Sequence, residues 1–432
     1  MNQEDQILKE DMEILGADRK LAEKFSGKTV FVTGATGLIG TQAVYALSMM
    51  NKICKSDIHV IAMVRNEQKA KKVFEDEIRE GMVSLYCGDI NEQISCKEKV
   101  DYIIHGASAT SSKYFVDHPV ETILTAIKGT RNILEYAKYA QVEGMVYLSS
   151  LEVYGTPDGT KKTISESDYG YIDPLSVRSS YSEGKRMAEC LCVSYAKEYD
   201  VPVKIARLSQ TFGAAVSYDD GRVFAEFARC VAEKKDIILH TQGNTVRTYC
   251  YTRDAVNAIF YILTNGIKSE AYNVTNMETA VSIREMAELV CSIYPESGIK
   301  VRIEIPEDIS GFGYNPEMRI ILNNEKTQAL GWKAEVGLAD MYRRMIESKK
   351  RRMNMKFGVI LHKTTMNLGD DIQTYASMQH LPSVDYIVER ENTDSFHSEN
   401  NEPVAVIMSA WWMWQKWNWP PAECIVPKLV SM

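Results

Sequence analysis

Four side chains of different chemistry lie in the middle of the chain, at a spacing suited to the oxidation of an alcohol. Ser150 and Glu152 follow a short apolar segment, and Tyr181 and Lys185 lie four residues apart further on. Residues four apart share one face of a helix. A phenol with a pKa near 10 is a poor base at neutral pH, but a neighbouring ammonium favours the phenolate and lowers that pKa. Tyr181 is therefore predicted to take the proton of a hydroxyl whose carbon loses a hydride, with Ser150 hydrogen-bonded to the same oxygen.

A glycine-rich turn far upstream supplies a place for a dinucleotide. Residues 33–40 read TGATGLIG, directly after an apolar segment and at the start of a predicted helix. Gly34 and Gly37 permit a tight turn and close approach to a pyrophosphate, and Gly40 permits tight helix packing. A positive nicotinamide ring would lower the Tyr181 pKa further, and the turn argues against an ordinary surface Tyr/Lys pair. The predicted cofactor-binding residues are Gly34, Thr36, Gly37, Leu38, Ile39 and Gly40, with Tyr181 and Lys185.

The ends of the next predicted strands bear on which dinucleotide binds. NAD sites usually place an acidic residue after the second strand, where this chain has Arg65. A guanidinium can pair with a 2′-phosphate, which favours NADP, or it can stack on adenine and allow both cofactors. Asp89 could meet the adenine amino group or cap a loop. Ile90 and Ala107 are predicted to line the same site.

The order of the segments predicts an α/β fold that positions these groups. Apolar strands alternate with helices, which indicates a Rossmann-type, doubly wound parallel sheet. The expected strands are 29–33, 58–64, 83–87, 102–105, 145–149 and 203–208. A smaller substrate lobe is expected largely from residue 207 onward. The expected divisions are a helical lead-in at 1–27, a domain at 28–346, a polar linker at 347–355 and a short separate α/β segment at 356–432.

Composition and charge exclude several classes of protein. The 432 residues carry a net charge of −8 and no long basic stripe, which argues against a nucleic-acid partner. Nine cysteines without metal-ligand spacing indicate free thiols in a reducing compartment and no metal site. The first residues lack the features of a signal peptide, and the longest apolar run is too short to span a bilayer. We therefore expect a cytoplasmic protein without membrane insertion.

Residues 28–346 resemble an extended short-chain dehydrogenase/reductase of the nucleotide-sugar epimerase/dehydratase group. The resemblance rests on the glycine turn, the serine at 150 and the Tyr-x-x-x-Lys pair, in that order. It implies that Ser150, Tyr181 and Lys185 form the catalytic triad. It also implies oxidation of C4 of a nucleoside-diphosphate sugar, conversion of the 4-keto intermediate, a tightly bound NAD or NADP, and a homodimer.

Glu152 bears on the second step. The 4,6-dehydratases of this group carry Asp-Glu here, and Leu151 replaces that aspartate, while simple 4-epimerases often have no carboxylate at this place. UDP-glucuronate decarboxylases keep the glutamate, and the chain is most similar to them. The similar segments are 107–115, 178–186, 211–213 and 220–224. A C4 ketone turns the C6 carboxylate into a β-keto acid, so CO₂ can leave, with Glu152 as acid/base or ordering a water. A 4-epimerase is the alternative, followed by an atypical 4,6-dehydratase.

Four further residues are candidates for binding a UDP-sugar, the favoured substrate class. Arg247 aligns with the arginine that such enzymes place at the sugar and diphosphate, and Arg222 is a second phosphate candidate. Surface salt bridges are the alternative for both arginines. Lys113 could face a substrate carboxylate. Gln210 stands where the family has an asparagine, and Ala126 replaces another, so the identity of the sugar stays open.

The segment 356–432 resembles the beginning of the polysaccharide pyruvyl transferase family. The resemblance rests on residues 367–375, residues 385–391 and a group of tryptophans. It implies a role in the synthesis of a cell-surface polysaccharide. A non-catalytic NADP-binding scaffold is the alternative from another class of protein, and the intact Ser/Tyr/Lys set argues against it.

Overall fold

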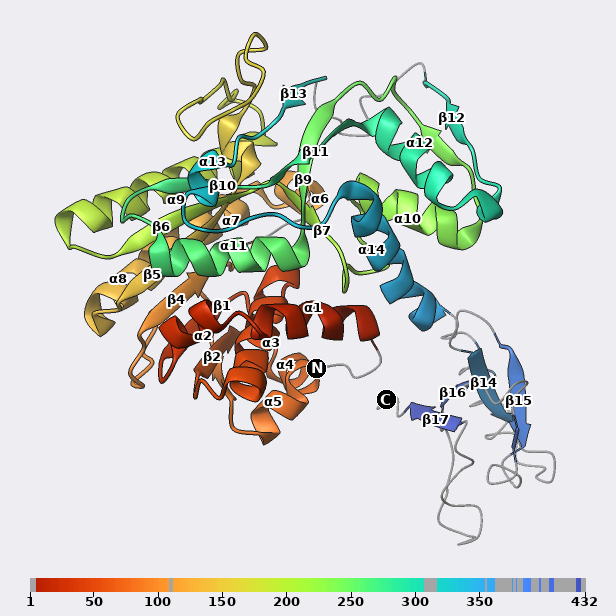
Figure 1. The fold of residues 1–432 in the computed structure, drawn as a ribbon, viewed down its shortest axis with the longest axis horizontal. Coiled ribbons are helices and arrows are strands. Elements are labelled where there is room, and N and C mark those ends of the chain that lie inside the picture. Colours follow the sequence, from red (N-terminus) through yellow and green to blue (C-terminus); the bar gives the residue numbers. More distant parts are fainter. Residues whose placement is uncertain are drawn as a thin grey trace, which may run out of the picture. The chain divides into compact units, whose positions relative to one another are not determined.

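The computed structural model describes residues 5–108, 112–306 and 317–353, and short stretches beyond them (Figure 1). The short stretches are 356–361, 375, 378, 384–389, 396–397, 404–407 and 425–428. The chain divides into two compact units, Met1–Ser348 and Lys349–Met432. This division lies inside the segment expected to be a linker, and helix α14 (Leu338–Met353) continues across it.

The first unit is built on a parallel sheet of seven strands in the order β10-β6-β5-β4-β1-β2-β3. The strands are β1 (Thr29–Thr33), β2 (His59–Val64), β3 (Val83–Cys87), β4 (Tyr102–His105), β5 (Gly144–Ser150), β6 (Val203–Leu208) and β10 (Ala271–Val274). The order reverses direction beside β1, as in doubly wound sheets. The predicted Rossmann-type fold is confirmed.

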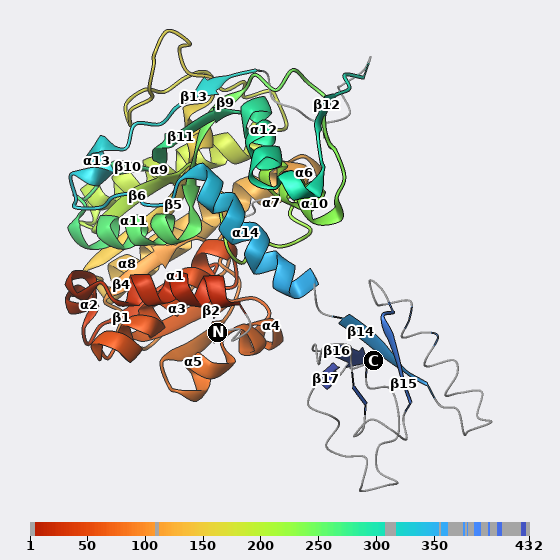
Figure 2. The same cartoon turned by 45° about the vertical axis from the view of Figure 1, so that its right-hand side comes forward.

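Successive residues of each strand point into different cores, because side chains alternate across a sheet. In β1, Val30 and Val32 belong to one buried cluster, whereas Phe31 belongs to another. The first cluster is covered by α3 (Leu38–Cys54), α11 (Thr252–Asn265), α1 (Gln6–Gly16) and α2 (Arg19–Phe25). The second is covered by α8 (Thr130–Ala140) and α9 (Ser179–Glu198). Figure 2 shows these helices around the sheet.

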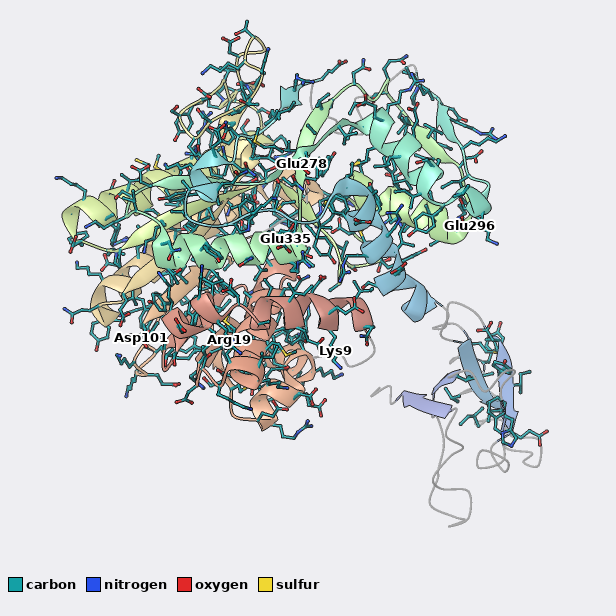
Figure 3. The ribbon with its side chains drawn as sticks, viewed as in Figure 1. Lys9, Arg19, Asp101, Glu278, Glu296 and Glu335 are labelled. Carbon is teal, nitrogen blue, oxygen red and sulfur yellow. The ribbon has the colours of Figure 1, made fainter. Side chains whose placement is uncertain are left out.

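A backbone-to-carboxylate bond joins two central strands of the sheet, and apolar burial attaches helix α1 to the core. Asp101, labelled in Figure 3, accepts a hydrogen bond from the Thr29 backbone N–H at 2.8 Å and so joins the start of β4 to β1. Helix α1 buries Leu8 and Met12 against the first cluster. The carboxylate of Asp11, on the same helix, is also buried. The helical lead-in is therefore an integral part of the first unit.

The second lobe of this unit has its own core. Strand β9 (Val246–Tyr251) pairs with β7 (Gln210–Phe212), β11 (Asn276–Ser282) and β13 (Arg319–Ile320). Aromatic side chains such as Phe212, Phe224 and Tyr342 fill the space between this sheet and the helices. The other elements are α10 (Val223–Glu233), β8 (Ile237–Leu239), α12 (Ile283–Ile293), a short helix η3 (Pro295–Ser297), β12 (Val301–Ile303) and α14.

Short helices lie between the strands of the main sheet and between the sheet and the lobe. Helix α11 and strand β10 return to the main sheet, so the lobe is built from several excursions. The connecting elements are α4 (Glu67–Val73), α5 (Glu75–Arg79), α6 (Ser112–Asp117), α7 (Pro119–Leu124), the π-helical η1 (Thr125–Gly129), the 3-10 helix η2 (Leu151–Tyr154) and α13 (Glu325–Gln328). None of the helices described in the chain is long and apolar enough to cross a membrane.

The second unit contains a parallel sheet of four strands in the order β15-β14-β16-β17. The strands are β14 (Lys356–Leu361), β15 (Tyr386–Glu389), β16 (Val404–Ile407) and β17 (Ile425–Lys428). Ile360, Val388, Val404 and Val406 form its buried cluster. The described residues of this unit thus form a small parallel sheet, and its assignment as a separate α/β segment stays a prediction. Most of the pyruvyl-transferase-like motif and the tryptophans between 411 and 419 lie outside the described residues.

Candidate active site

The turn between β1 and α3 accepts only glycine at two positions. Gly34 has a φ of 68°, and a Cβ there would lie 2.9 Å from the backbone nitrogen of Ala107. A Cβ at Gly40 would lie 2.2 Å from the carbonyl oxygen of Gly34. Both positions are strained or blocked for any other residue. The turn therefore lies directly against the segment that follows β4.

A threonine that the sequence argument missed ties these segments together. The Thr33 hydroxyl oxygen accepts hydrogen bonds from the backbone N–H groups of Gly106 and Ala107, both at 3.1 Å. It also bonds to Nδ1 of His105 at 2.7 Å. Burial, followed by the charge of Lys185, lowers the His105 pKa to about 3, so this imidazole is neutral. The signal was present, since Thr33 directly precedes the glycine turn.

The start of α3 fits a dinucleotide phosphate. The Ncap residue Gly37 offers no side-chain cap, so the first N–H groups of the helix are open to a ligand. Thr36 is half-buried in the turn. Leu38 packs against the core of the second lobe and Ile39 against a core of the main sheet. The cradle is thus backbone-lined and lies beside both parts of the unit.

The predicted residues near the adenine end occupy different surroundings. Arg65 is exposed directly after β2, and Asn66 caps α4 by accepting from the Lys69 N–H at 2.9 Å. Asp89 accepts a hydrogen bond from the Asn91 N–H at 2.8 Å, which is the loop-cap alternative. Ile90 is buried and lies against Gly129, the last residue of η1. Its side chain therefore packs in the core next to the predicted site.

The structure brings the serine, tyrosine and lysine together from β5 and α9. The Ser150 hydroxyl oxygen accepts from the Glu152 N–H at 3.2 Å, and the Ser150 side chain acts to lower the Tyr181 pKa. Lys185 Nζ donates to the carbonyl oxygen of Leu148 at 2.7 Å and lies 5.8 Å from the centroid of the Tyr181 ring. This is the arrangement expected from the spacing of the two segments.

The expected lowering of the Tyr181 pKa is wrong for the groups that the protein itself supplies. Burial, and then the negative charge of Glu152, raise this pKa well above its usual value of 10. The hydrogen bond to Ser150 and the charges of Arg178 and Arg222 lower it in part. Burial also lowers the Lys185 pKa to about 8, so its charge is itself costly. The spacing of the motif displays the cation near Tyr181 but not the desolvation that raises the Tyr181 pKa.

Glu152 is held by two side chains. Arg178 Nη2 donates to one carboxylate oxygen at 2.7 Å, and the Ser182 hydroxyl donates to the other at 3.1 Å. Arg178 and Glu152 each keep 21% of their side-chain surface exposed, so the pair faces the site without being sealed in the core. Leu151, the residue in place of the dehydratase aspartate, is buried in a small apolar cluster.

An aromatic stack against Tyr181 was also missed. The rings of Phe115 and Tyr181 lie parallel within 10°, with centroids 4.2 Å apart. The guanidinium carbon of Arg178 lies 5.0 Å from the Phe115 centroid. Both residues fall in segments that resemble the decarboxylases, but their types alone pointed to no chemistry. Phe115 is buried although it belongs to the short helix α6.

A buried polar network supports the end of β5. Glu189 accepts hydrogen bonds from the Ser149 hydroxyl at 2.6 Å and from Arg207 Nη2 at 2.6 Å. Arg207 also donates to the Tyr154 hydroxyl at 3.0 Å. Glu189 lies one turn after Lys185 and raises the pKa of that lysine against the effect of burial. These residues are distant in sequence, so spacing alone did not reveal them.

The residues predicted to bind the substrate differ in the partners that they contact. Arg222 pairs with Asp220 at 2.6 Å, as in the salt-bridge alternative, yet its charge still acts on Tyr181. Arg247 contacts Met318 Sδ at 3.4 Å, and its buried Nε has no hydrogen-bond partner among the described residues. Gln210 lies on β7 opposite β9, the strand of Arg247.

Lys113 and Ala126 complete the set named from the sequence. Lys113 is exposed on α6. Ala126 lies in the π-helical segment η1, and its Cβ would be 3.2 Å from a Cβ placed on Gly184 of α9. Across the described part of the chain, no three His, Cys, Asp or Glu side chains gather as a metal site would require.

A backbone cradle at the first βα turn is followed along the chain by Ser150 at the end of β5 and by Tyr181 and Lys185 on α9. Residues 30–275 match the model of the NAD dependent epimerase/dehydratase family. The chain belongs to this family, as the sequence resemblance predicted.

Three proteins that are similar to this chain have names that state a reaction. The chain is 30% identical over 341 residues to UDP-glucuronic acid decarboxylase 6 of Arabidopsis thaliana, covering 76% of this chain and 91% of that protein. A UDP-glucose 4-epimerase of Thermotoga maritima with UDP-glucose superposes with a TM-score of 0.63 at 20% identity, covering 76% of this chain and 100% of the other. A dTDP-glucose 4,6-dehydratase of Streptomyces venezuelae with NAD superposes with a TM-score of 0.60 at 22% identity, covering 76% and 97%. Modification of nucleotide sugars is common to all three.

Proposed function

We propose that this protein oxidises C4 of a nucleotide-linked hexuronate and decarboxylates the 4-keto intermediate, as a UDP-glucuronate decarboxylase does. The observation that carries the proposal is the pairing of Tyr181 and Lys185 on α9, with Lys185 Nζ 5.8 Å from the Tyr181 ring centroid and with Ser150 and Glu152 also acting on the phenol. The resemblance to the Arabidopsis decarboxylase supports the same choice.

The first step is assigned to Tyr181 and Ser150. In its phenolate form, Tyr181 accepts the proton of the C4 hydroxyl while Ser150 holds the same oxygen. When bound in the glycine cradle, a nicotinamide would supply the acceptor, and later the donor, of the C4 hydride. Lys185 lies near the tyrosine and adds positive charge as the phenolate forms.

The second step uses the new ketone. The C5–C6 bond of the β-keto acid breaks, CO₂ leaves, and its electron pair becomes an enolate over C5, C4 and the C4 oxygen. Tyr181 and Ser150 stabilise the charge on that oxygen by hydrogen bonds. Glu152, whose two oxygens accept from Arg178 and Ser182, orders a water that protonates C5, and solvent replaces this proton, so the reaction consumes one proton in all.

A 4-epimerase is the second candidate. Both oxygens of Glu152 already accept hydrogen bonds, from Arg178 and Ser182. If Glu152 only held Arg178 and Ser182 in place, the site would have no carboxyl group to assist decarboxylation. Epimerisation at C4 needs no acid at this position and would then be the favoured reaction. A 4,6-dehydratase is disfavoured because Leu151 is buried and carries no carboxylate.

We assign the diphosphate of the substrate to the lobe that carries Arg247 and Arg222. The Nε of Arg247, which has no hydrogen-bond partner among the described residues, is a buried donor for which a phosphate oxygen is a fitting acceptor. Arg222 would exchange part of its pairing with Asp220 for phosphate. Gln210 and Lys113 are assigned to the sugar, the latter facing the carboxylate.

We propose that NADP is preferred over NAD because Arg65 follows β2 where NAD sites carry an acid. Binding of both cofactors to the wild type and to Arg65→Glu, measured by titration calorimetry, tests this proposal. The substitution is expected to weaken NADP more than NAD. Equal weakening of both would assign Arg65 to the adenine instead.

Mass spectrometry of the products tests the proposed reaction. The protein is incubated with UDP-glucuronate, UDP-glucose, UDP-N-acetylglucosamine and the dTDP-, GDP- and CDP-hexoses. Loss of CO₂ from UDP-glucuronate is the expected result. An unchanged mass with a new diastereomer in the NMR spectrum would establish the epimerase instead, and loss of water from a neutral hexose would establish a dehydratase. If no sugar nucleotide is converted, the result favours the alternative that the protein is a non-catalytic NADP-binding scaffold.

A further inference from the structure

We propose that Arg178 is a positioning residue that acts through two neighbours, holding the Glu152 carboxylate by an ion pair and the Phe115 ring against Tyr181 by stacking. The inference rests on the proposed function, since it concerns how Tyr181 and Glu152 are prepared for the sugar. It adds a residue that touches neither the reacting hydroxyl nor the cofactor cradle.

An ion pair with Arg178 fixes the orientation of the Glu152 carboxylate. Arg178 lies directly before α9, three residues ahead of Tyr181, so the helix sets its position. Its Nη2 lies 2.7 Å from one oxygen of Glu152, while Ser182 holds the other at 3.1 Å. A carboxylate held on both oxygens has one orientation. Without Arg178, Glu152 would keep one weak neutral donor and could rotate.

An aromatic stack joins Phe115 to Tyr181, with Arg178 beside it. Phe115 is 2% exposed and lies parallel to the Tyr181 ring at 4.2 Å. The Arg178 guanidinium lies 5.0 Å from the same Phe115 ring, within cation–π range. The carbonyl oxygen of Phe115 accepts from the Ser180 hydroxyl at 3.2 Å. Helix α6 is thereby attached to α9 at the point where the catalytic tyrosine lies.

Charged side chains from several elements surround Tyr181. The ionisable groups that act on Tyr181 are Glu152 from η2 and Arg178 and Arg222 from the segments before α9 and α10. Lys185 of α9 faces its ring, and Tyr147 of β5 interacts with it from the sheet. Glu152 raises the Tyr181 pKa, whereas Arg178 and Arg222 lower it. Removal of Arg178 leaves the negative charge of Glu152 beside the phenol without its closest counter-charge.

The pH dependence of C4 oxidation distinguishes this role from a merely structural one. The absorbance at 340 nm is followed by stopped flow when enzyme loaded with the oxidised cofactor, whose positive ring lowers the Tyr181 pKa, meets UDP-glucuronate from pH 6 to 10. In Arg178→Met, the alkaline rise of the rate is expected to move up by about one pH unit, because a counter-charge near the phenol is lost. Glu152→Gln alone should move it down, and the double variant should return it near the wild-type position.

Matched variants separate this effect from general damage. Arg178→Lys keeps the charge but loses the planar group, so it should keep the pH profile and lower the rate. Arg284→Gln breaks an exposed Arg–Glu pair of α12 and should change neither. The proposal is overturned if Arg178→Met leaves the pH profile in place, or if Glu152→Gln fails to reverse the shift.

A second readout needs no substrate. The Tyr181 ring resonances, assigned with Tyr181→Phe in ring-labelled protein, report the ring current of Phe115. Phe115→Leu should move them downfield, and Arg178→Met should move them in the same direction. If Arg178→Met leaves them unchanged, the stacking role is wrong. If no sugar nucleotide reacts with the wild type, the proposed function fails while this NMR result still judges Arg178.

Discussion

Tyr181 is surrounded by groups that act on its proton in opposite directions. Burial and Glu152 favour the neutral phenol, whereas Ser150, Arg178 and Arg222 favour the phenolate. Burial lowers the pKa of Lys185, the lysine that the sequence spacing indicates, to about 8. At the scale of single residues, the site is therefore a balance of desolvation and charge in which a bound cofactor ring supplies additional positive charge.

Replacement of Tyr181 by phenylalanine tests the residue at the centre of this balance. The variant keeps the stacked ring and loses the hydroxyl that moves the proton, so kcat should fall by about 10²- to 10⁴-fold. Binding of the dinucleotide, measured by calorimetry, should persist. Tyr139→Phe removes an exposed hydroxyl as a control. Wild-type turnover by Tyr181→Phe would contradict the mechanism.

At the scale of elements, the turn between β1 and α3 depends on close backbone contact. A Cβ at Gly40 would meet the Gly34 carbonyl oxygen at 2.2 Å, so Gly40→Ala must displace the helix or the turn. The expected cost is about 1 to 3 kcal/mol of stability. We also expect dinucleotide binding to weaken by about tenfold or more, because the first N–H groups of α3 move.

Thermal unfolding and cofactor titration of Gly40→Ala measure both effects. Gly159→Ala is the matched control, because a Cβ at Gly159 meets nothing within 4 Å. A Gly40→Ala variant with unchanged affinity for both cofactors would show that the cradle does not bind the phosphates.

Helix α1 is fastened by a buried carboxylate. Asp11 accepts hydrogen bonds from the Tyr251 hydroxyl at 2.5 Å and from Arg344 Nη2 at 2.9 Å. Burial nevertheless raises its pKa from 3.8 to about 6, with Tyr251, Arg344 and Arg253 opposing the rise. The folded protein thus holds this proton more tightly than the unfolded chain. Its contribution to stability is complete below about pH 4 and is lost as the pH rises through about 6.

Asp11→Asn should remove this dependence on pH. The free energy of unfolding of the wild type relative to the variant should fall by about 2 to 3 kcal/mol as the pH rises from 4 to 7. Chemical denaturation at several pH values measures the difference. Asp57→Asn, at an exposed position, is the control. A difference that stays constant, or that grows with pH, would contradict the assignment.

At the scale of the whole molecule, the two units have separate cores. Every described candidate site residue lies within Met1–Ser348, and the cluster around Val404 in the second unit includes none of them. Domains with their own core commonly fold alone. The chemistry proposed here therefore belongs to the first unit.

A protein truncated after Met353 tests this assignment and keeps α14 whole. Its kcat and KM for the active sugar nucleotide should agree with those of the full chain within about twofold. The melting transition of the first unit should also be retained. Loss of activity with an intact melting transition would show that the second unit contributes to the site.

The sequence by itself determined the strands, the glycine turn and the Tyr-x-x-x-Lys helix. The predicted strands 29–33, 83–87, 102–105 and 203–208 agree with the structure residue for residue. These features are local, because short apolar runs, glycine geometry and the helical repeat act within a few neighbouring residues. The family resemblance depends on the same local motifs and is confirmed by the match over residues 30–275.

Only the tertiary structure decided which side chains surround the reacting groups. Thr33 meets His105, Arg178 meets Glu152, Phe115 stacks on Tyr181, and Glu189 pairs with Arg207. These contacts join segments that are far apart along the chain, so no spacing rule reveals them. The direction of the Tyr181 pKa shift was also decided here, because desolvation depends on everything that packs around the phenol and outweighs the charges that a motif displays.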